Sequence, residues 1–180
     1  MRRTLFPNAI VLVGVVALVA IGAAGGAQAK KPALSATPVF KLHLKPSQEV
    51  EPRIKGLKAD AVGSVTFDLT RNALGAITSG EVIFYFNYKF PGAVVISGLH
   101  IHQGAKGTNG DVVVSSGAAE ALDADGEGNL TKIVSGTPDI LLTLQAILAN
   151  PRGYYVNLHT TTPDHPGGAL REQMHNPKKR

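Results

Sequence analysis

The chain contains no cysteine, so no disulfide stabilises it, and thiolate catalysis and cysteine-ligated zinc are excluded. Its formal charge is only +5, and after residue 29 its basic residues are scattered except at Lys30-Lys31 and Lys178-Lys179-Arg180. Such clusters are typical of solvated tails. The sequence lacks the basic, aromatic-rich pattern of nucleic-acid-binding proteins. We therefore expect no nucleic-acid partner.

Residues 1–29 have the features of a secretory signal peptide. Arg2 and Arg3 form a positive n-region, residues 9–24 are apolar, and Ala27-Gln28-Ala29 fits an A-x-A cleavage site. The apolar run is broken by glycines and is shorter than the roughly 20 residues that cross a bilayer. We therefore expect cleavage after Ala29 rather than an uncleaved anchor. The product would be secreted or periplasmic, without a membrane span, and its formal charge would fall from +5 to +3.

Beyond this segment, apolar and polar residues alternate with period two, which is typical of half-buried strands. Glycine- and asparagine-rich stretches between the alternating segments predict turns. In Pro166-Gly167-Gly168, which lies between two of the expected strands, at least one glycine should have a positive φ. Strands are predicted at about residues 40–44, 63–69, 81–88, 94–102, 111–115, 131–134, 154–160 and 169–174.

One segment has helical spacing instead. Thr137 is a suitable N-cap, and Pro138 follows at the first helical position. Apolar residues then recur every three or four positions until Asn150-Pro151, which should end the helix. A helix is therefore predicted at about residues 138–149, with its apolar stripe covering one end of the sheets.

These elements predict an all-β fold, an antiparallel β-sandwich of Greek-key, superoxide-dismutase-like or Ig-like type with one short helix. The expected organisation is a signal peptide (1–29), a flexible lead-in (30–38), one domain (39–175) and a basic tail (176–180).

Three histidines are candidate metal ligands. His100 and His102 lie two residues apart on a predicted strand, so they share a face, with Cα atoms about 6.6 Å apart. His159, in another predicted strand, is the natural third ligand, and Asn157 on its face could orient an imidazole. The alternative is structural: the histidines are polar surface residues, or they hydrogen-bond the adjacent loop backbone.

Two long segments carry a family resemblance. The first begins His100-Ile101-His102-Gln103-Gly104, and the second runs from Asn150 through Val156-Asn157-Leu158-His159 to Arg171-Glu172-Gln173. Together they resemble the CHRD domain, a secreted module named after chordin, over about residues 40–174. In chordin-like proteins this module belongs to an extracellular regulator that engages growth factors. The resemblance implies an exported, non-catalytic binding or structural module whose partner is an extracellular protein or small ligand.

A remoter resemblance concerns copper. The H-x-H pair and the later strand are similar to copper-ligand segments of copper/zinc superoxide dismutase, which implies that His100, His102 and His159 occupy three copper-ligand positions. Arg171 would then approximate the guanidinium that guides the anion, facing the open side of the site. No histidine lies between His102 and His159, so the bridging and zinc ligands have no counterparts. A two-metal dismutase is excluded; a copper-binding protein or a copper-only redox enzyme is the alternative function.

Overall fold

A computed structural model describes residues 37–51, 53–118 and 120–177, all within one compact unit. The predicted signal peptide, most of the lead-in and residues 178–180 lie outside the described residues. Neither helix α1 (Pro138–Ala149) nor the short 3-10 turns in the described ranges combine the length and hydropathy required to cross a membrane.

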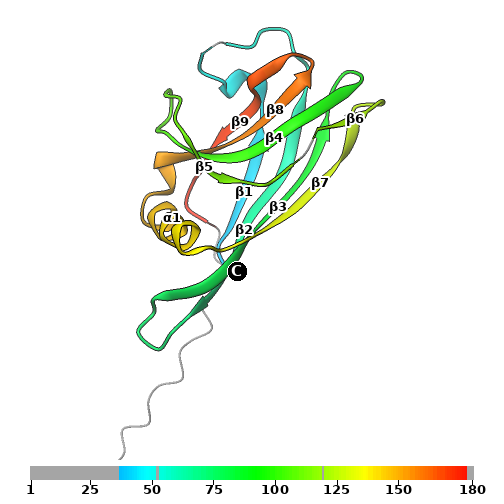
Figure 1. Ribbon diagram of the computed structural model, residues 1–180. Helices are drawn as coiled ribbons and strands as arrows, with labels where there is room; N and C mark the ends of the chain where they lie inside the picture. The colour runs from blue at the N-terminus through cyan, green and yellow to red at the C-terminus, as the bar shows by residue number, and fades with distance from the viewer. Residues whose placement is uncertain (1–36, 52, 119, 178–180) are drawn as a thin grey trace, which may run out of the picture. The chain divides into compact units, whose positions relative to one another are not determined.

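Two antiparallel sheets form the fold, as the alternating pattern predicts (Figure 1). The first has the order β1-β2-β3-β7, and the second has the order β5-β4-β8-β9 with β6 also pairing β4. The three-residue strand β6 was not predicted, because so short a segment carries no period. The strands are β1 (Val39–Leu44), β2 (Asp60–Arg71), β3 (Ile77–Lys89), β4 (Val94–Gln103), β5 (Val112–Ser115), β6 (Ala121–Asp123), β7 (Glu127–Ser135), β8 (Tyr154–Thr162) and β9 (His165–Gln173).

The core is built from the inward-facing apolar residues of both sheets, whose burial is the main favourable term in folding. In the first sheet, Phe67, Phe84 and Phe86 are fully buried. In the second, the completely buried residues include Leu99, Ile101, Val156, Leu158 and Leu170. The β-sandwich prediction is therefore confirmed.

Helix α1 (Pro138–Ala149) matches the predicted segment. The Thr137 side chain accepts a hydrogen bond from the Ile140 backbone N–H at 3.4 Å, as an N-cap does. Leu144 and Ile147 are fully buried in the core. A short 3-10 turn, η2 (Pro151–Gly153), follows and leads into β8.

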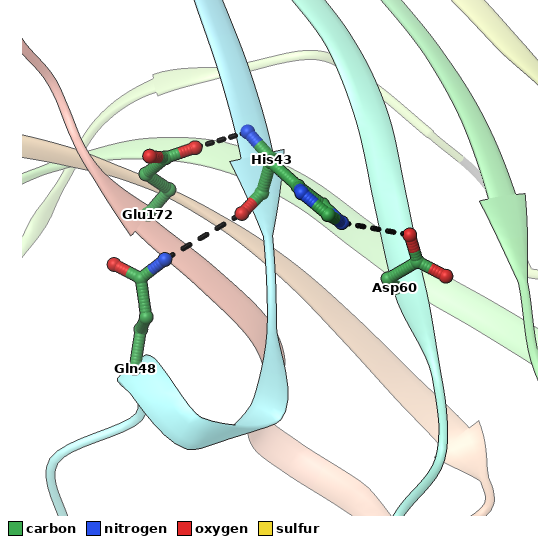
Figure 2. Close-up of polar contacts among 4 residues, drawn as sticks. All are labelled: His43, Gln48, Asp60 and Glu172. Carbon is green, nitrogen blue, oxygen red and sulfur yellow. Dashed lines mark hydrogen bonds and ion pairs between the residues drawn. The ribbon is translucent and has the colours of Figure 1, made fainter.

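The end of β1 joins the second sheet at one edge. Lys45 and Arg171 of β9 exchange two backbone hydrogen bonds, of 3.1 and 3.2 Å. The carboxylate of Glu172, also on β9, accepts from the backbone N–H of His43, whose ring contacts Asp60 at 2.8 Å (Figure 2). β1 and β9 are thus tied together.

The chain then turns through η1 (Pro46–Gln48) and continues over the outer face of β9. In Figure 2, the Gln48 side chain reaches back to the carbonyl of His43, at 3.5 Å. Glu49 follows, and its side chain lies against Asn157 and Gly168. This segment closes the sandwich edge and also covers part of the second sheet.

The β4–β5 loop covers the same outer face. The Arg171 guanidinium donates to Asn109 Oδ1 at 2.9 Å and to the Thr108 carbonyl at 2.8 Å. Gly107 has a φ of +86°, as expected for this glycine-rich turn. At Gly110 a Cβ would lie 1.6 Å from the Gln103 carbonyl oxygen, so this close approach requires glycine.

Residues 154–160 of β8 are consequently buried on both faces. The glycine prediction holds in part: Gly168 has a φ of +131°, but Gly167 and Gly168 lie within β9 rather than in the turn.

Candidate metal centre

The three predicted histidines lie on one face of two adjacent strands. In the β4–β8 register His100 is opposite Asn157, His102 is opposite Tyr155, and Gly98 is opposite His159. Ile101, the residue between the two β4 histidines, is fully buried in the core. Backbone alternation therefore places His100, His102 and His159 together on the outer face of the sheet.

The three rings are in mutual contact. Nε2 of His102 lies 3.3 Å from Nε2 of His159. The ring centroids of His100 and His159 are 4.8 Å apart. Each histidine offers one ring nitrogen, and these three nitrogen atoms all lie within 4.8 Å of one another. The structure thus brings together the residues that the sequence nominated as ligands.

Backbone carbonyls fix the orientation of two rings. His102 Nδ1 lies 2.9 Å from the Gly110 carbonyl oxygen, and His159 Nδ1 lies 2.8 Å from that of Pro166. A carbonyl oxygen can only accept, so each Nδ1 carries the hydrogen. In the neutral rings both Nε2 atoms then present lone pairs, which is the state in which imidazole ligates a metal.

His100 is held differently. Its Nδ1 is buried and has no hydrogen-bond partner among the described residues. Gly98 makes room for the ring, because a Cβ there would lie 2.6 Å from His100 Cε1. The sequence analysis missed this role of Gly98, which only the packed ring reveals.

The surroundings favour neutral imidazoles. Burial, together with the nearby His159 and His102, lowers the pKa of His100 to about 4. Burial also lowers the pKa of His102 and of His159, although carbonyl hydrogen bonds oppose the shift in both. His102 and His159 are only 7% and 8% exposed, respectively.

Arg171 does not face the open side of the site, and that prediction is wrong. Its side chain is 2% exposed, and its Cζ lies 3.4 Å from the centroid of the Tyr155 ring. His102 stacks on the same tyrosine, with centroids 4.8 Å apart. Tyr155 is thus packed between residues from the two flanking strands. The guanidinium donates hydrogen bonds to Asn109 and Thr108 of the β4–β5 loop, which hold it away from the open side. The spacing of residues in the sequence could not reveal this long-range contact.

Asn157 lies between His100 and Arg171 in the strand register, so it is near the histidines as predicted. However, no hydrogen bond joins it to an imidazole in the described ranges, and its Oδ1 is buried without a partner. Its amide instead faces Glu49 and Gly168.

Glu49 is the charged residue that the sequence analysis left outside the site. It is 7% exposed. Burial raises its pKa to about 7, against the opposing effects of the Arg171 charge and the Asn157 amide. A surface-like Gln-Glu-Val stretch gives no sign of such burial; it follows from the pairing of Lys45 with β9.

A family model for the CHRD domain matches residues 40–174. The chain belongs to the CHRD domain family. The matched range includes all three histidines, Glu49 and Arg171. No curated protein and no solved structure matches the chain.

Proposed function

We propose that this CHRD-domain protein is an exported, non-catalytic binding module that holds a copper ion through His100, His102 and His159. The observation that carries the proposal is the pair of Nε2 atoms that face each other at 3.3 Å while both Nδ1 atoms are engaged by carbonyls. Without a cation, two lone pairs are directed at each other.

A proton between the two rings would relieve this contact, but burial disfavours an imidazolium here. A metal ion relieves it without protonating either ring. With metal–nitrogen bonds of about 2.0–2.1 Å, a 3.3 Å separation corresponds to an angle of about 107° at the metal. A metal ion fits between the two Nε2 atoms at that angle, so His102 and His159 need little movement.

His100 supplies the third nitrogen. It is more exposed than the other two histidines and its ring is not tied by a carbonyl, so it can rotate towards the ion. Imidazole donors suit copper and zinc, and copper stands higher in the divalent affinity order. We therefore expect copper to bind more tightly than zinc.

Binding is better supported than redox catalysis. A dismutase-like enzyme would need a cationic group that steers an anionic substrate to an open metal position. Arg171 is buried against Tyr155 and bound to the β4–β5 loop, which leaves it unable to fill that role.

Export is part of the proposal. Residues 1–29 have the sequence features of a cleavable signal peptide, and CHRD domains are associated with secreted or exported proteins. The module would act outside the cytoplasm, on an extracellular protein or small ligand.

The test is a calorimetric titration of the exported chain with Cu(II) and, separately, Zn(II), with metal content measured by elemental analysis. One copper ion per chain, bound more tightly than zinc, is expected. Absence of copper binding would overturn the metal proposal and favour histidines that only fix loop backbone.

A further inference from the structure

A pocket with several charged residues in its wall lies on the covered outer face of the second sheet. It encloses about 400 Å³ between the segment after β1, the β4–β5 loop and β9. Pockets for small molecules commonly measure about 300–1,000 Å³, so this one is large enough for a ligand of monosaccharide size. None of the three candidate metal ligands lines it.

The charged wall of this pocket is mostly cationic. Arg53, Lys106 and Arg171 all line it, and Glu49 is the one acidic residue among the lining residues. Arg171 is fixed by its bonds to the β4–β5 loop, whereas Arg53 is exposed and only loosely paired with Glu51, at 3.8 Å. An anion would therefore contact the buried, fixed guanidinium of Arg171 and the exposed side chains of Arg53 and Lys106, which can move.

Glu49 provides a second, independent indication of a ligand. The residue is 93% buried and part of its carboxyl group lines the pocket, while its Oε1 lies beside Gly168 and the Asn157 amide, without a hydrogen-bond partner in the described part of the chain. Buried carboxyl groups are normally satisfied by hydrogen bonds, so the side of this one that lines the pocket favours a ligand that brings a donor. Three cations line the same pocket, which makes an ammonium group unfavourable there, whereas a neutral hydroxyl meets no repulsion.

We infer that this pocket binds a small hydroxycarboxylate such as a sugar acid, whose carboxylate pairs with Arg53 and Lys106 while a hydroxyl donates to Glu49. This site is separate from the metal centre, and it gives the binding module a small-molecule ligand of defined chemistry.

The first experiment compares three probes by NMR titration of the full exported chain. D-glucuronate carries both groups, D-glucose lacks the carboxylate, and acetate lacks the hydroxyls. Because a charge-assisted hydrogen bond and a buried acceptor each change affinity by about tenfold, glucuronate should bind about tenfold or more tightly than either probe. Equal affinity for glucuronate and glucose, or for glucuronate and acetate, would overturn the assignment, as would no binding.

Variants that remove charges from the pocket test which side chains bind the carboxylate. Arg53→Gln combined with Lys106→Gln should weaken glucuronate binding about tenfold. The matched control combines Lys41→Gln with Lys55→Gln, which removes two exposed charges outside the pocket and should change nothing. Equal losses in both double variants would show a non-specific charge effect and overturn the proposal.

Glu49→Gln keeps the shape of the side chain and should reduce the preference for glucuronate over acetate. Thermal melting establishes that each variant is folded. Copper titration of the Arg53 and Lys106 double variant should match the wild type, because these residues lie outside the metal centre. A failed sugar-acid test with intact copper binding therefore refutes this pocket alone.

Discussion

His102 and His159 face each other through Nε2 atoms 3.3 Å apart, while a backbone carbonyl holds the Nδ1 of each ring. The carbonyls come from Gly110, in the β4–β5 loop, and from Pro166, at the start of β9. These two backbone groups therefore fix the tautomers, and β4 and β8 fix the spacing of the rings. A structural role in holding the backbone and a metal-binding role of the free Nε2 atoms are compatible, because they use different nitrogens.

Removal of one ligand should weaken copper binding strongly. His159→Ala should lower the affinity about 100-fold or more, since changes even to outer partners of a metal site cost about 10–100-fold. Competition titration with a chelator of known affinity measures the loss. His43→Ala and His175→Ala are the controls, because neither residue belongs to the cluster. Equal affinities in all three variants would mean that the cluster is not the site.

The metal-free protein should lose stability in acid through the cluster. The pKa of His100 is about 4 in the folded state, against an ordinary value of 6.5, so the unfolded chain binds a proton first as pH falls. Above about pH 6.5 His100 is neutral in both states, and its contribution to the free energy of unfolding is fully present. This contribution is lost as pH falls towards about 4. Urea denaturation at pH 7.5 and pH 5 measures it.

His100→Gln is the comparison, because the titrating carboxyl groups are common to both proteins. The variant should show a smaller drop in unfolding free energy between pH 7.5 and pH 5. An identical drop would contradict the assigned environment of His100.

Adjacent glycines in β9 should differ in their tolerance of a side chain. Gly168 has a φ of +131°, and a Cβ there would lie 2.3 Å from Asn157 Nδ2, whereas no atom of the described residues lies within 4 Å of a Cβ at Gly167. Gly168→Ala should lower the free energy of unfolding by about 1 kcal/mol or more, because an L side chain is strained at that φ. Gly167→Ala should change it by less than about 0.5 kcal/mol. Equal melting of the two variants would show that the backbone is unconstrained.

Arg171 should matter for stability rather than for catalysis. Arg171→Met leaves Asn109 and the Thr108 carbonyl without their donor, so the unfolding free energy should fall by about 3 kcal/mol. Arg171→Lys should not restore it, because an ammonium lacks the planar fork that reaches both acceptors. Arg152→Lys, at an exposed position in η2, is the control. Full stability of the lysine variant would argue against the two-acceptor arrangement.

Export predicts a processed N-terminus. N-terminal sequencing of the protein recovered outside the cytoplasm should begin at Lys30, after Ala27-Gln28-Ala29. A product that retains Met1 would contradict cleavage.

Local patterns were sufficient to predict the sandwich and α1. Thr137, Pro138 and the spacing of Leu144 and Ile147 specify a helix whatever surrounds it, and period two specifies strands. The three histidines were also accessible, because side chains two apart on a strand must share a face.

The environment of the site was not predictable, because it depends on long-range pairing. The bridge from Lys45 to Arg171 carries Glu49 over the sheet, and the β4–β5 loop folds back onto Arg171. The alternating pattern predicts that the outer face of the second sheet is exposed to solvent, but these two segments cover it. This covering accounts for the burial of Arg171 and Glu49, which composition and spacing do not encode.

X-ray absorption at the copper edge tests the central claim most directly. The wild-type protein, loaded with one equivalent of Cu(II) at neutral pH, should show three imidazole nitrogens at about 2.0 Å. The His102→Ala protein, loaded in the same way, should lose that signature. A copper ion surrounded mainly by oxygen atoms, or an imidazole signal that survives loss of His102, would contradict a metal centre formed by His100, His102 and His159.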